Sequence, residues 1–510
     1  MEKRHNVVKV VLVTLLVFLL LSWILPAAYF QTSYVEQGRV QMGLFDIFNY
    51  PATAISYFGY IAVFILVVGG FYGILNRIGA YRKMLDSLAT TFKKHGKLVI
   101  SIMMALLAII TSVCGLQLGL MIFFPFLISL ILLMGYDKIV AALTVVGSTM
   151  IGIAGTTFAY SNTSVITSLL SVKITSNLLI KILVLVFGLA LLIGNTMIYI
   201  VKSGKDTKKT TKKSTKKAAK KDTKTESKDD TELLIPSDAK TKASIVPMIV
   251  VFSVMFVIMI LSFISWAGAF SNKAFESATS AVTGFKVFKF ALFGKILGNV
   301  NAFGSWTLTD LSGMVIVAMI LLALIYKVKF SEAMDAFFEG MKKALVPAVV
   351  VVLIYTGLVI TTYHPFQLVL YKAIFGLTKG FNIFTAMITG VLASVFNADP
   401  LYSFQAVIPY LASIVSKDAF STIAALYPAV YGLTMLIAPT SVVLMVVLSY
   451  MGVSYKDWFK SIWKILVEFL AVILVLFLIF SPMAIILKIV LIVIAVAVIV
   501  LMTLSSLSII

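Results

Sequence analysis

Cysteine, histidine and charged residues are all scarce in this sequence of 510 residues. The single cysteine, Cys114, excludes a disulfide within the chain, and the 3 histidines do not have the spacing of zinc ligands. Only 12% of the residues are charged, whereas 61% are hydrophobic. A soluble domain of this composition would leave large apolar patches in water. The composition therefore predicts a polytopic membrane protein whose partner is the lipid bilayer.

Positive charge is concentrated in one segment. Residues 202–242 contain 14 lysines against 7 acidic residues, repeat Lys-Lys among Thr, Ser and Ala, and lack an apolar period. We expect this segment to be a disordered linker. By the positive-inside rule, the linker and the N-terminus, with Lys3 and Arg4, should be cytoplasmic. This charge serves to set topology, so contact with nucleic acid is not expected.

Hydropathy predicts eight simple spans of a bilayer about 30 Å thick. The first is interpreted as a span and not as a signal peptide, because its apolar run from Val7 to Ile24 is longer than a signal core. Lys181 and Glu468 are expected near span ends, where long side chains reach water. The expected spans are residues 7–30, 55–76, 178–201, 243–269, 311–327, 346–363, 463–482 and 485–506.

Two regions do not fit simple spans. Each contains a predicted re-entrant hairpin, which enters and leaves the membrane on one side, followed by a long apolar helix broken by polar residues. With these two broken helices, the sequence predicts an all-α protein of about ten transmembrane spans plus two re-entrant hairpins. The hairpins are residues 97–136 and 381–416; the broken helices are residues 139–172, with the break at 160–163, and 419–451, with the break at 438–441.

The two regions read as one structural unit written twice. Ser112-Val113 leads to Thr163-Ser164-Val165 in the first copy, and Ser394-Val395 leads to Thr440-Ser441-Val442 in the second. Weak duplication within apolar segments is typical of secondary transporters, which bind their substrate between the copies. Counting crossings from a cytoplasmic N-terminus puts the hairpins on opposite faces, which predicts inverted repeats. The expected parts are residues 1–201, the linker 202–242, and residues 243–510.

The hairpin tips and helix breaks should mark the binding cavity, because unpaired backbone at membrane depth is tolerated only where it is buried or lines a cavity. Helix N-termini there attract an anionic group, and Ser, Thr or Asn oxygens can hold Na⁺. The expected substrate- or ion-binding residues are Gly115, Gln117, Ser161, Asn162, Thr163, Asn397, Asp399, Ser403, Thr440 and Ser441, with Asn162, Thr163, Asp399 and Thr440 as candidate Na⁺ ligands.

Several of these residues also have a purely structural interpretation. The tip glycine Gly115 could serve close helix packing, and the hydroxyl groups could bond to helix carbonyls. Asp399 is an intramembrane carboxylate that could bind Na⁺, exchange a proton or pair with a substrate amine. It could instead only cap the helix that begins near Pro400, or be exposed to extracellular water.

The function class follows from the same features, with alternatives. A small carboxylate-bearing solute, such as a C4-dicarboxylate or an amino acid, suits a secondary active transporter coupled to Na⁺ or H⁺. An ion channel, or a cation/proton exchanger without an organic substrate, would also use polar helix breaks. A membrane enzyme would need converging acidic, histidine or cysteine side chains, and the duplicated core is nearly free of charge. We therefore expect neither catalysis nor a cofactor.

Several short segments carry more information than hydropathy alone, namely Trp23-Ile24-Leu25-Pro26-Ala27 and residues 69–74, 133–137, 437–445 and 453–458. They resemble the anaerobic C4-dicarboxylate carrier (uptake C type, YfcC-like) family of the ion transporter superfamily. Pro439-Thr440-Ser441, followed by Tyr455 and Trp458, is the most specific part, and the resemblance covers most of the chain except the linker and the last span. It implies a scaffold and a transport domain, a homodimer in the plasma (cell) membrane, and elevator-type movement of carboxylates or amino acids.

The sequence departs from the pattern of that family at two places. Relatives tend to carry acidic residues in the first hairpin tip, where this chain has Gly115-Leu116-Gln117. They tend to carry Asn-Pro at the first break, where it has Ser161-Asn162. A changed substrate or coupling ion would account for both departures, and so would loss of transport.

Overall fold

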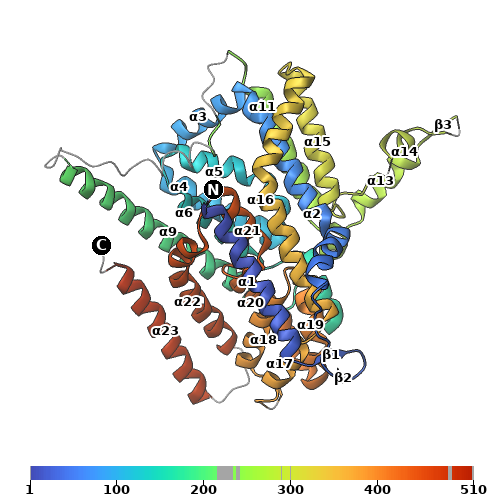
Figure 1. Cartoon of the computed structure of the whole chain (residues 1–510), viewed down its shortest axis with the longest axis vertical. Helices are drawn as coiled ribbons and strands as arrows, with labels where there is room; N and C mark the ends of the chain where they lie inside the picture. Colours follow the sequence, from blue (N-terminus) through green and yellow to red (C-terminus); the bar gives the residue numbers. More distant parts are fainter. Residues whose placement is uncertain are drawn as a thin grey trace.

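The computed structural model of the chain describes residues 2–214, 234–236, 242–288, 290–298, 300–378, 380–479 and 485–507. In these residues the protein is a helical bundle with two short antiparallel β-hairpins (Figure 1). Eight helices are long and apolar enough to cross a membrane, which confirms the predicted all-α polytopic class. They are α1 (Glu2–Ile24), α2 (Asp46–Arg77), α4 (Gly96–Cys114), α9 (Leu178–Ser214), α11 (Val246–Phe263), α15 (Leu308–Ile325), α16 (Phe330–Tyr363) and α22 (Tyr455–Ile479).

Most of the expected spans have different ends, and the largest differences are at α2, which begins nine residues before the expected start at 55, and α16, which begins sixteen residues before the expected start at 346. The expected span 7–30 stops at Ile24, because Pro26 disfavours helix at the residue before it, and β1 (Ala27–Phe30) then pairs with β2 (Tyr34–Gln37). Helix α11 stops at Phe263, before the short α12 (Trp266–Phe270). Helix α22 begins at Tyr455, eight residues before the expected start at 463. The last expected span forms α23 (Ile485–Leu507).

Helices α2 and α16 lie side by side along much of their length and form the central pair of the bundle (Figure 1). Their 32 and 34 residues correspond to about 48 and 51 Å, more than the hydrocarbon thickness. Glycines allow their backbones to touch: a Cβ atom on Gly73 would overlap the carbonyl oxygen of Ala336, and one on Gly340 would overlap that of Gly69. Close approach through small residues is a common way to pack membrane helices.

The first expected hairpin consists of α4 and α5 (Phe124–Leu133), joined by residues 115–118 and the short 3₁₀ helix η1 (Gly119–Ile122). Gly115 ends α4 in the left-handed conformation, with φ of 72°, and its N–H donates to the carbonyl oxygen of Thr111 over 2.9 Å. Glycine adopts this conformation without the steric cost that a side chain brings.

The first broken helix consists of α6 (Lys138–Ala142), the π-helical turn η2 (Leu143–Gly147), α7 (Ser148–Ala154) and α8 (Tyr160–Leu170). Its break covers residues 155–159, so the prediction of a break at 160–163 is wrong by about five residues. The polar residues at 160–163 form the first turn of α8, where hydroxyl groups bond to the backbone without interrupting it, as Thr163 does with the carbonyl oxygen of Ala159 over 3.0 Å.

The second hairpin follows α17 (Gln367–Phe375) and consists of α18 (Ile383–Phe396) and α19 (Pro400–Ile414). After η3 (Lys417–Ala419), the second broken helix consists of α20 (Phe420–Met435) and α21 (Val442–Met451). Its break covers residues 436–441, which contain the predicted interruption at 438–441. Pro439 cannot donate a backbone hydrogen bond and so favours a break at this place.

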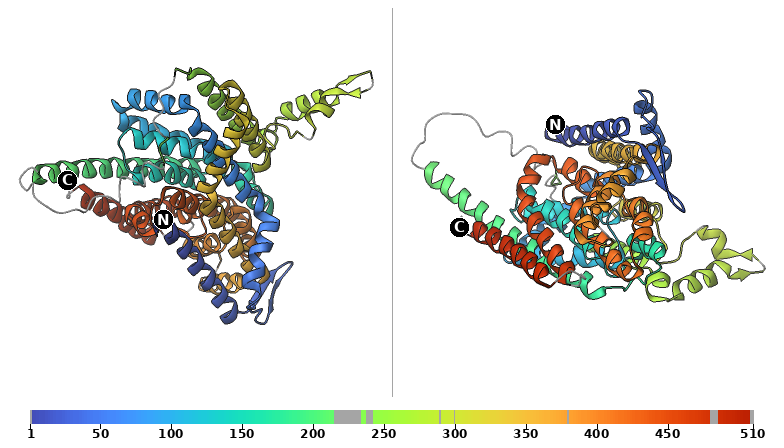
Figure 2. Two further views of the ribbon diagram at one scale, coloured as in Figure 1. Left: turned by 45° about the horizontal axis from the view of Figure 1, so that its top comes forward. Right: turned by 90° about the horizontal axis from the view of Figure 1, so that it is seen from below.

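The remaining elements lie around this core. Helix α3 (Gly79–Lys93) packs against α5, whereas α9, α22 and α23 pack on another side of the bundle (Figure 2). The segment with α13 (Ala274–Gly284), β3 (Lys286–Val287), β4 (Phe290–Ala291) and α14 (Leu292–Leu297) projects away from the other helices (Figure 1).

The predicted disordered linker is structured at both ends. Helix α9 continues to Ser214, because extending an existing helix is easier than starting one. Near the other end, Leu234 is only 5% exposed and its apolar neighbours Ile235 and Pro236 also pack against the bundle. We call residues 234–236 the docked segment. Residues 215–233 and 237–241 of the predicted linker lie outside the described part of the chain.

Candidate functional site

In the first copy, the end of α4 is bonded to the helix break. The hydroxyl group of Ser112 donates to the carbonyl oxygen of Gly155 over 2.6 Å, and the Thr157 N–H donates to the Ser112 carbonyl oxygen over 3.0 Å. Gly115 packs directly on the start of α8, since a Cβ atom there would overlap the Oγ of Ser161 and lie 3.4 Å from the Cγ of Asn162. The predicted residues Gly115, Ser161 and Asn162 are therefore together.

The second copy makes a related set of contacts. The hydroxyl group of Thr440, in the break, donates to the carbonyl oxygen of Ser394 over 3.4 Å. Tyr431 of α20 donates to the carbonyl oxygen of Ala398, in the hairpin tip, over 3.0 Å. Asp399 is the N-cap residue of α19, and its Oδ1 accepts the N–H of Leu401 over 2.8 Å. The capping role considered from the sequence is therefore present, whatever further role Asp399 has.

The contacts of the two serines place the copies in a different register from the one expected. Ser112 and Ser394 are 282 residues apart, and so are the first residues of α8 and α21, Tyr160 and Val442. The sequence comparison aligned Thr163 with Thr440, an offset of 277 residues. In the structure Thr157, which bonds to Ser112, has its counterpart in Thr440, which bonds to Ser394, at an offset of 283 residues.

A small cavity lies between the two hairpin tips and the second helix break. Gln117 comes from the first hairpin tip, Asp399 from the second tip, and Ser441 from the second break. Three predicted residues that are distant in sequence thus line one space. The other lining residues are Leu118, Met150, Tyr355, Ala398, Tyr431, Met435, Val442 and Val443.

Two buried polar atoms at the breaks have no hydrogen-bond partner in the part of the chain that the structure describes. They are the Oγ of Ser441, whose residue is 1% exposed, and the Nδ2 of Asn162, whose residue is 7% exposed. Buried polar groups in native proteins are nearly always satisfied, so such atoms are candidates for contacts with a ligand, an ion or water. Ser441 is also the N-cap residue of α21, whose first N–H groups have no partner within the helix.

The other predicted residues use their polar groups in contacts within the protein. Asn397 donates to the carbonyl oxygen of Ala393 over 2.9 Å, and Ser403 donates to that of Asn397 over 3.2 Å. Thr163 and Thr440 bond to backbone carbonyls as described above. None of these four residues lines the cavity.

Sequence reasoning missed four residues that shape this region. Ser112 and Thr157 join the first tip to the first break, and the polar pair Thr156-Thr157 directly after Gly155 could have indicated them. Tyr355 of α16 and Tyr431 of α20 line the cavity, yet each lies in an apolar helical run. No sequence signal distinguishes them from core aromatics.

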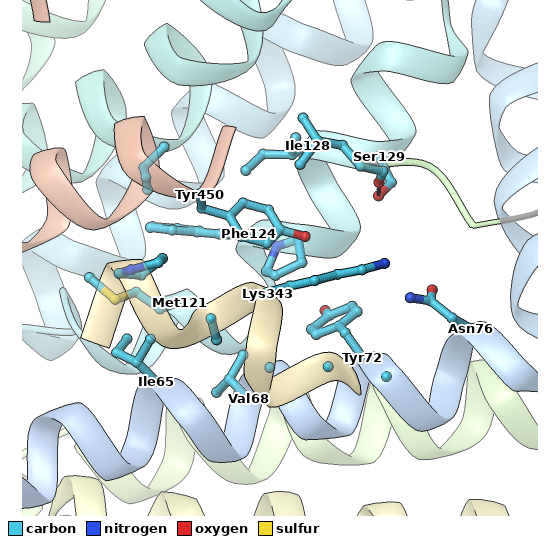
Figure 3. A pocket seen from close by; sticks show the side chains of 18 of the residues that line it. Ile65, Val68, Tyr72, Asn76, Met121, Phe124, Ile128, Ser129, Lys343 and Tyr450 are labelled. Carbon is cyan, nitrogen blue, oxygen red and sulfur yellow. Dashed lines mark hydrogen bonds between the residues drawn. The ribbon is translucent and has the colours of Figure 1, made fainter. Parts of the chain in front are cut away.

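A second, larger hollow contains none of the predicted site residues. Its empty volume is about 790 Å³, and it lies between α2, α16, α21 and the first hairpin (Figure 3). Asn76, Lys343 and Ser129 are polar, whereas most other lining side chains are apolar. We assign the candidate site to the smaller cavity, because the tips, the break and the unpartnered hydroxyl group of Ser441 meet there.

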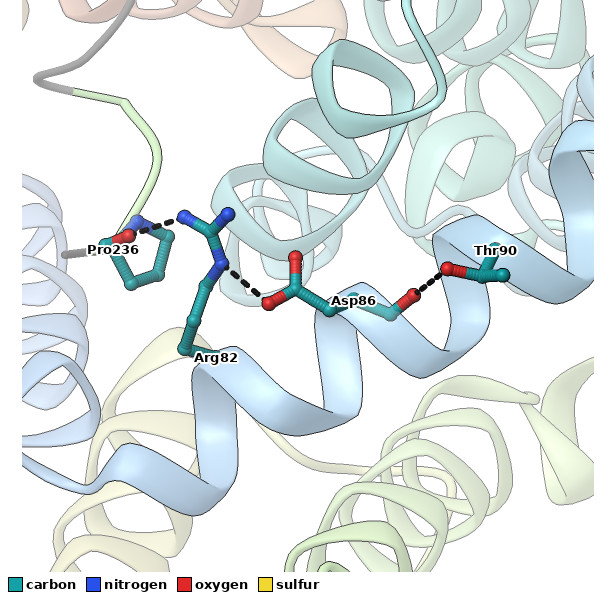
Figure 4. A network of polar contacts seen from close by, with 4 residues as sticks. All are labelled: Arg82, Asp86, Thr90 and Pro236. Carbon is teal, nitrogen blue, oxygen red and sulfur yellow. Dashed lines mark hydrogen bonds and ion pairs between the residues drawn. The ribbon is translucent and has the colours of Figure 1, made fainter. Parts of the chain in front are cut away.

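The docked segment forms part of the wall of the larger hollow. Ser129 of α5 donates its hydroxyl hydrogen to the carbonyl oxygen of Leu234 over 2.7 Å. Arg82 of α3 donates from Nη1 to the carbonyl oxygen of Pro236 over 2.6 Å, and its Nε pairs with Asp86 at 2.8 Å (Figure 4). The docked segment therefore connects the first hairpin to α3.

We expect Leu234→Glu to release the docked segment, because it would place a carboxylate at a buried apolar position. In a Cys114→Ser background carrying Asn76→Cys, a water-soluble maleimide should then label Asn76→Cys several times faster. Lys242→Gln, at an exposed position shortly after the docked segment, is the matched control and should leave the labelling rate unchanged. Equal rates in Leu234→Glu and Lys242→Gln would contradict the expectation.

Comparison with known proteins supports the prediction that the chain is a membrane transporter. A model of the C4-dicarboxylate anaerobic carrier family matches residues 27–482. An uncharacterised protein of Haemophilus influenzae is 25% identical over 146 residues, which is 29% of this chain and 29% of that relative. Among solved structures, the chain is similar to the YdaH transporter of Alcanivorax borkumensis (13% identity, 93% and 97% of the two chains, TM-score 0.39) and to MtrF of Neisseria gonorrhoeae (12%, 92% and 94%, TM-score 0.37).

Proposed function

Because this chain belongs to the C4-dicarboxylate anaerobic carrier family, we propose that it is a secondary active transporter for small carboxylate-bearing solutes such as C4-dicarboxylates or amino acids. The solute binds in the cavity between the two copies. The observation that carries the proposal is the meeting of Gln117, Asp399 and Ser441 around one space. A secondary transporter binds its substrate where such copies meet.

The groups around the cavity suit a carboxylate handle. Ser441, Val442 and Val443 line the cavity at the start of α21, so the N-terminus of that helix borders the space. Free N–H groups and the partial positive charge of a helix N-terminus favour an anion. The Ser441 hydroxyl group, which lacks a protein partner among the described residues, is a further donor.

Asp399 suits the cation that accompanies the solute. A carboxylate beside the cavity repels a solute carboxylate and attracts Na⁺, a proton or a substrate amine. Asn162 and Thr163, across the first tip, and Thr440, in the second break, are further oxygen donors close to the tips. Either Na⁺ or H⁺ could be the coupling cation bound by this set of groups. Transport is then symport or antiport.

The fold suits movement of one part against another. Helices α2 and α16 are the scaffold, and the hairpins with the broken helices are the elevator-type transport part, arranged as inverted repeats. The larger hollow serves as the access route, because the first hairpin tip and α21 border both spaces: Leu118 and Val443 line the cavity, whereas Met121 and Val446 line the hollow. The transporter is a homodimer in the plasma membrane, with its N-terminus and residues 202–242 in the cytoplasm.

Counterflow in proteoliposomes tests the proposal. Vesicles loaded with unlabelled C4-dicarboxylate or amino acid should accumulate the labelled solute transiently, with and without Na⁺, because alternating access exchanges one molecule for another. A channel gives no such accumulation. If all members of a panel of both solute classes fail to accumulate, while ion flux through the protein is measurable, the channel or ion-exchanger alternative would replace this proposal.

We expect Asp399→Asn to lower coupled uptake about tenfold or more, which corresponds to ~1.4 kcal/mol. The amide keeps the shape and one capping oxygen but removes the charge that holds the cation. Asp310→Asn is a matched control, since Asp310 accepts hydrogen bonds at the start of α15 and does not line the cavity. Wild-type uptake in Asp399→Asn across pH and Na⁺ concentration would leave Asp399 with its capping role alone.

A further inference from the structure

Glu468 lies in the middle of a helix long enough to cross the membrane. It is 13 residues after Tyr455 and 11 before Ile479, about 20 Å along α22 from its first residue. Its side chain does not reach water within the bundle, since the residue is only 1% exposed. The sequence led us to expect that Glu468 reaches water, and its burial contradicts that part of the expectation.

Only one oxygen of this carboxyl group is bonded. Asn195 of α9 donates from Nδ2 to Oε2 of Glu468 over 2.7 Å, and also to the carbonyl oxygen of Leu191 over 3.0 Å. The Oε1 atom of Glu468 is buried and has no hydrogen-bond partner within the described residues. One oxygen of the carboxyl group is therefore hydrogen-bonded, and the other is buried without a hydrogen bond.

The helices packed on α22 bring no cation into hydrogen-bond contact with Glu468 in the part of the chain that the structure describes. Lys464 is one turn away on α22 itself and exerts a Coulomb attraction. On α9, Lys181 lies 14 residues before Asn195 and donates to the carbonyl oxygen of Ile174. Tyr199 lies one turn after Asn195 and donates to Asp137, and Lys202 lies two turns after Asn195.

The other neighbouring helices are equally poor in charge. Helix α18 has no ionisable residue, and neither does α23 from residue 489 to 507. The hydroxyl groups of Tyr427 and Tyr431 on α20 bond to Thr389 and to Ala398. His5 and Lys9 of α1 lie near the contact of Asn6 with Tyr455, at the far end of α22.

An ionised carboxylate in this setting is costly, because burial removes its hydration and no cationic donor replaces the lost hydrogen bonds. A neutral carboxyl group avoids most of that cost. Its hydrogen would be on Oε1, because Oε2 already accepts the bond from Asn195. Asn195 supplies an N–H that can also support the ionised form when the proton leaves. The bond from Asn195 to Oε2 can therefore be kept in both protonation states of Glu468.

We propose that Glu468 and Asn195 form a proton-binding site in the interior of the helical bundle, with the exchangeable proton on Oε1 of Glu468 and the Asn195 amide on Oε2. When the proton leaves, the O–H bond breaks, water takes the proton, and the carboxylate remains bonded to Asn195. The site is separate from the proposed solute cavity, since neither residue lines it. The inference does not depend on which solute the protein carries.

The site borders the first broken helix. Phe469, the next residue along α22, packs on Gly188 of α9, where a Cβ atom would lie 2.6 Å from Cε2 of Phe469 and 3.1 Å from Cδ1 of Ile151. Ile151 belongs to α7, which ends three residues later at the break. A change of charge at Glu468 thus occurs beside an element that carries the candidate site.

Infrared difference spectroscopy of the full-length protein in lipid tests this proposal without any transport measurement. We expect a carboxylic C=O band that shifts in D₂O, decreases as the pH rises from about 5 to about 10, and is missing in Glu468→Gln. Glu276→Gln, at an exposed position on α13, should keep the band. A wild-type spectrum without such a band, a band that persists unchanged over this pH range, or one that survives in Glu468→Gln would overturn the proposal.

Asn195→Ala provides the second variant, which carries the test if Glu468→Gln does not fold. Removing the amide takes away a hydrogen bond that supports the ionised form, so the proton should leave at a higher pH than in the wild type. The same midpoint in Asn195→Ala and wild type would overturn the assignment of Asn195 to the site. A failed counterflow experiment with an intact infrared band would count against the proposed function alone.

Discussion

Gly115→Val abolishes uptake while leaving a folded helical protein, as we expect from two independent effects at the first hairpin tip. Gly115 has φ of 72°, a region that costs a residue with a side chain about 1–2 kcal/mol and a β-branched one more. A side chain there would also overlap the Oγ of Ser161. The tip would be displaced from α8, which would separate Gln117 from the cavity. Counterflow and a thermal melt in detergent measure the two outcomes.

A matched glycine distinguishes these effects. Gly135 has φ of 93°, but a Cβ atom there would have no atom within 4 Å. Gly135→Val therefore carries the backbone cost alone, and we expect it to keep most of its uptake. Gly115→Ala combined with Ser161→Gly should recover part of the activity that Gly115→Ala loses. Similar losses in Gly115→Val and Gly135→Val would show that the contact with Ser161 is unimportant.

Gly73→Leu should prevent stable assembly of the bundle, which is the largest structural effect that we expect from one substitution. A Cβ atom on Gly73 would overlap the carbonyl oxygen of Ala336, a backbone atom that cannot move without shifting α16. The two helices would have to separate along their shared surface, and membrane helices depend on such close packing. Size-exclusion profiles of detergent-solubilised protein should show aggregation or loss of the folded peak.

Gly59→Leu on the same helix is the control. A Cβ atom on Gly59 would meet only Cγ2 of Ile55, at an ordinary contact distance of 3.4 Å. We expect its profile and melting temperature to be close to those of the wild type. A normal profile for Gly73→Leu would mean that the α2–α16 contact tolerates several ångströms of separation.

The sequence predicted which helices, hairpins and breaks are present better than it predicted where they begin and end. Hydropathy was sufficient for the long spans, because an apolar run of bilayer length has few alternatives. The hairpins and broken helices were found through glycine, proline and polar residues in apolar runs. The first break was misplaced because hydroxyl-bearing residues such as Ser161 and Thr163 can sit inside a helix by bonding to its carbonyls, whereas Gly155 gave a weaker signal.

The candidate site was predictable in part for the same reason. Gln117, Asp399 and Ser441 could be singled out because polar residues at tips and breaks are conspicuous in an apolar background. Tyr355 and Tyr431 line the same cavity, but only the three-dimensional packing of α16 and α20 brings them there. Glu468 was conspicuous as well, but its burial against Asn195 of α9 follows only from the packing of the two helices.

The glycine contact between α2 and α16 has a consequence for biosynthesis. Gly73 and its partner Gly340 are separated by 267 residues, so the small-residue face of α2 emerges from the ribosome long before the helix that covers it. At roughly 5–20 residues per second, α2 waits on the order of tens of seconds for α16. During that interval lipid, or another protein of the insertion machinery, must cover the glycine face, and the central pair of the bundle can form only in the second half of synthesis.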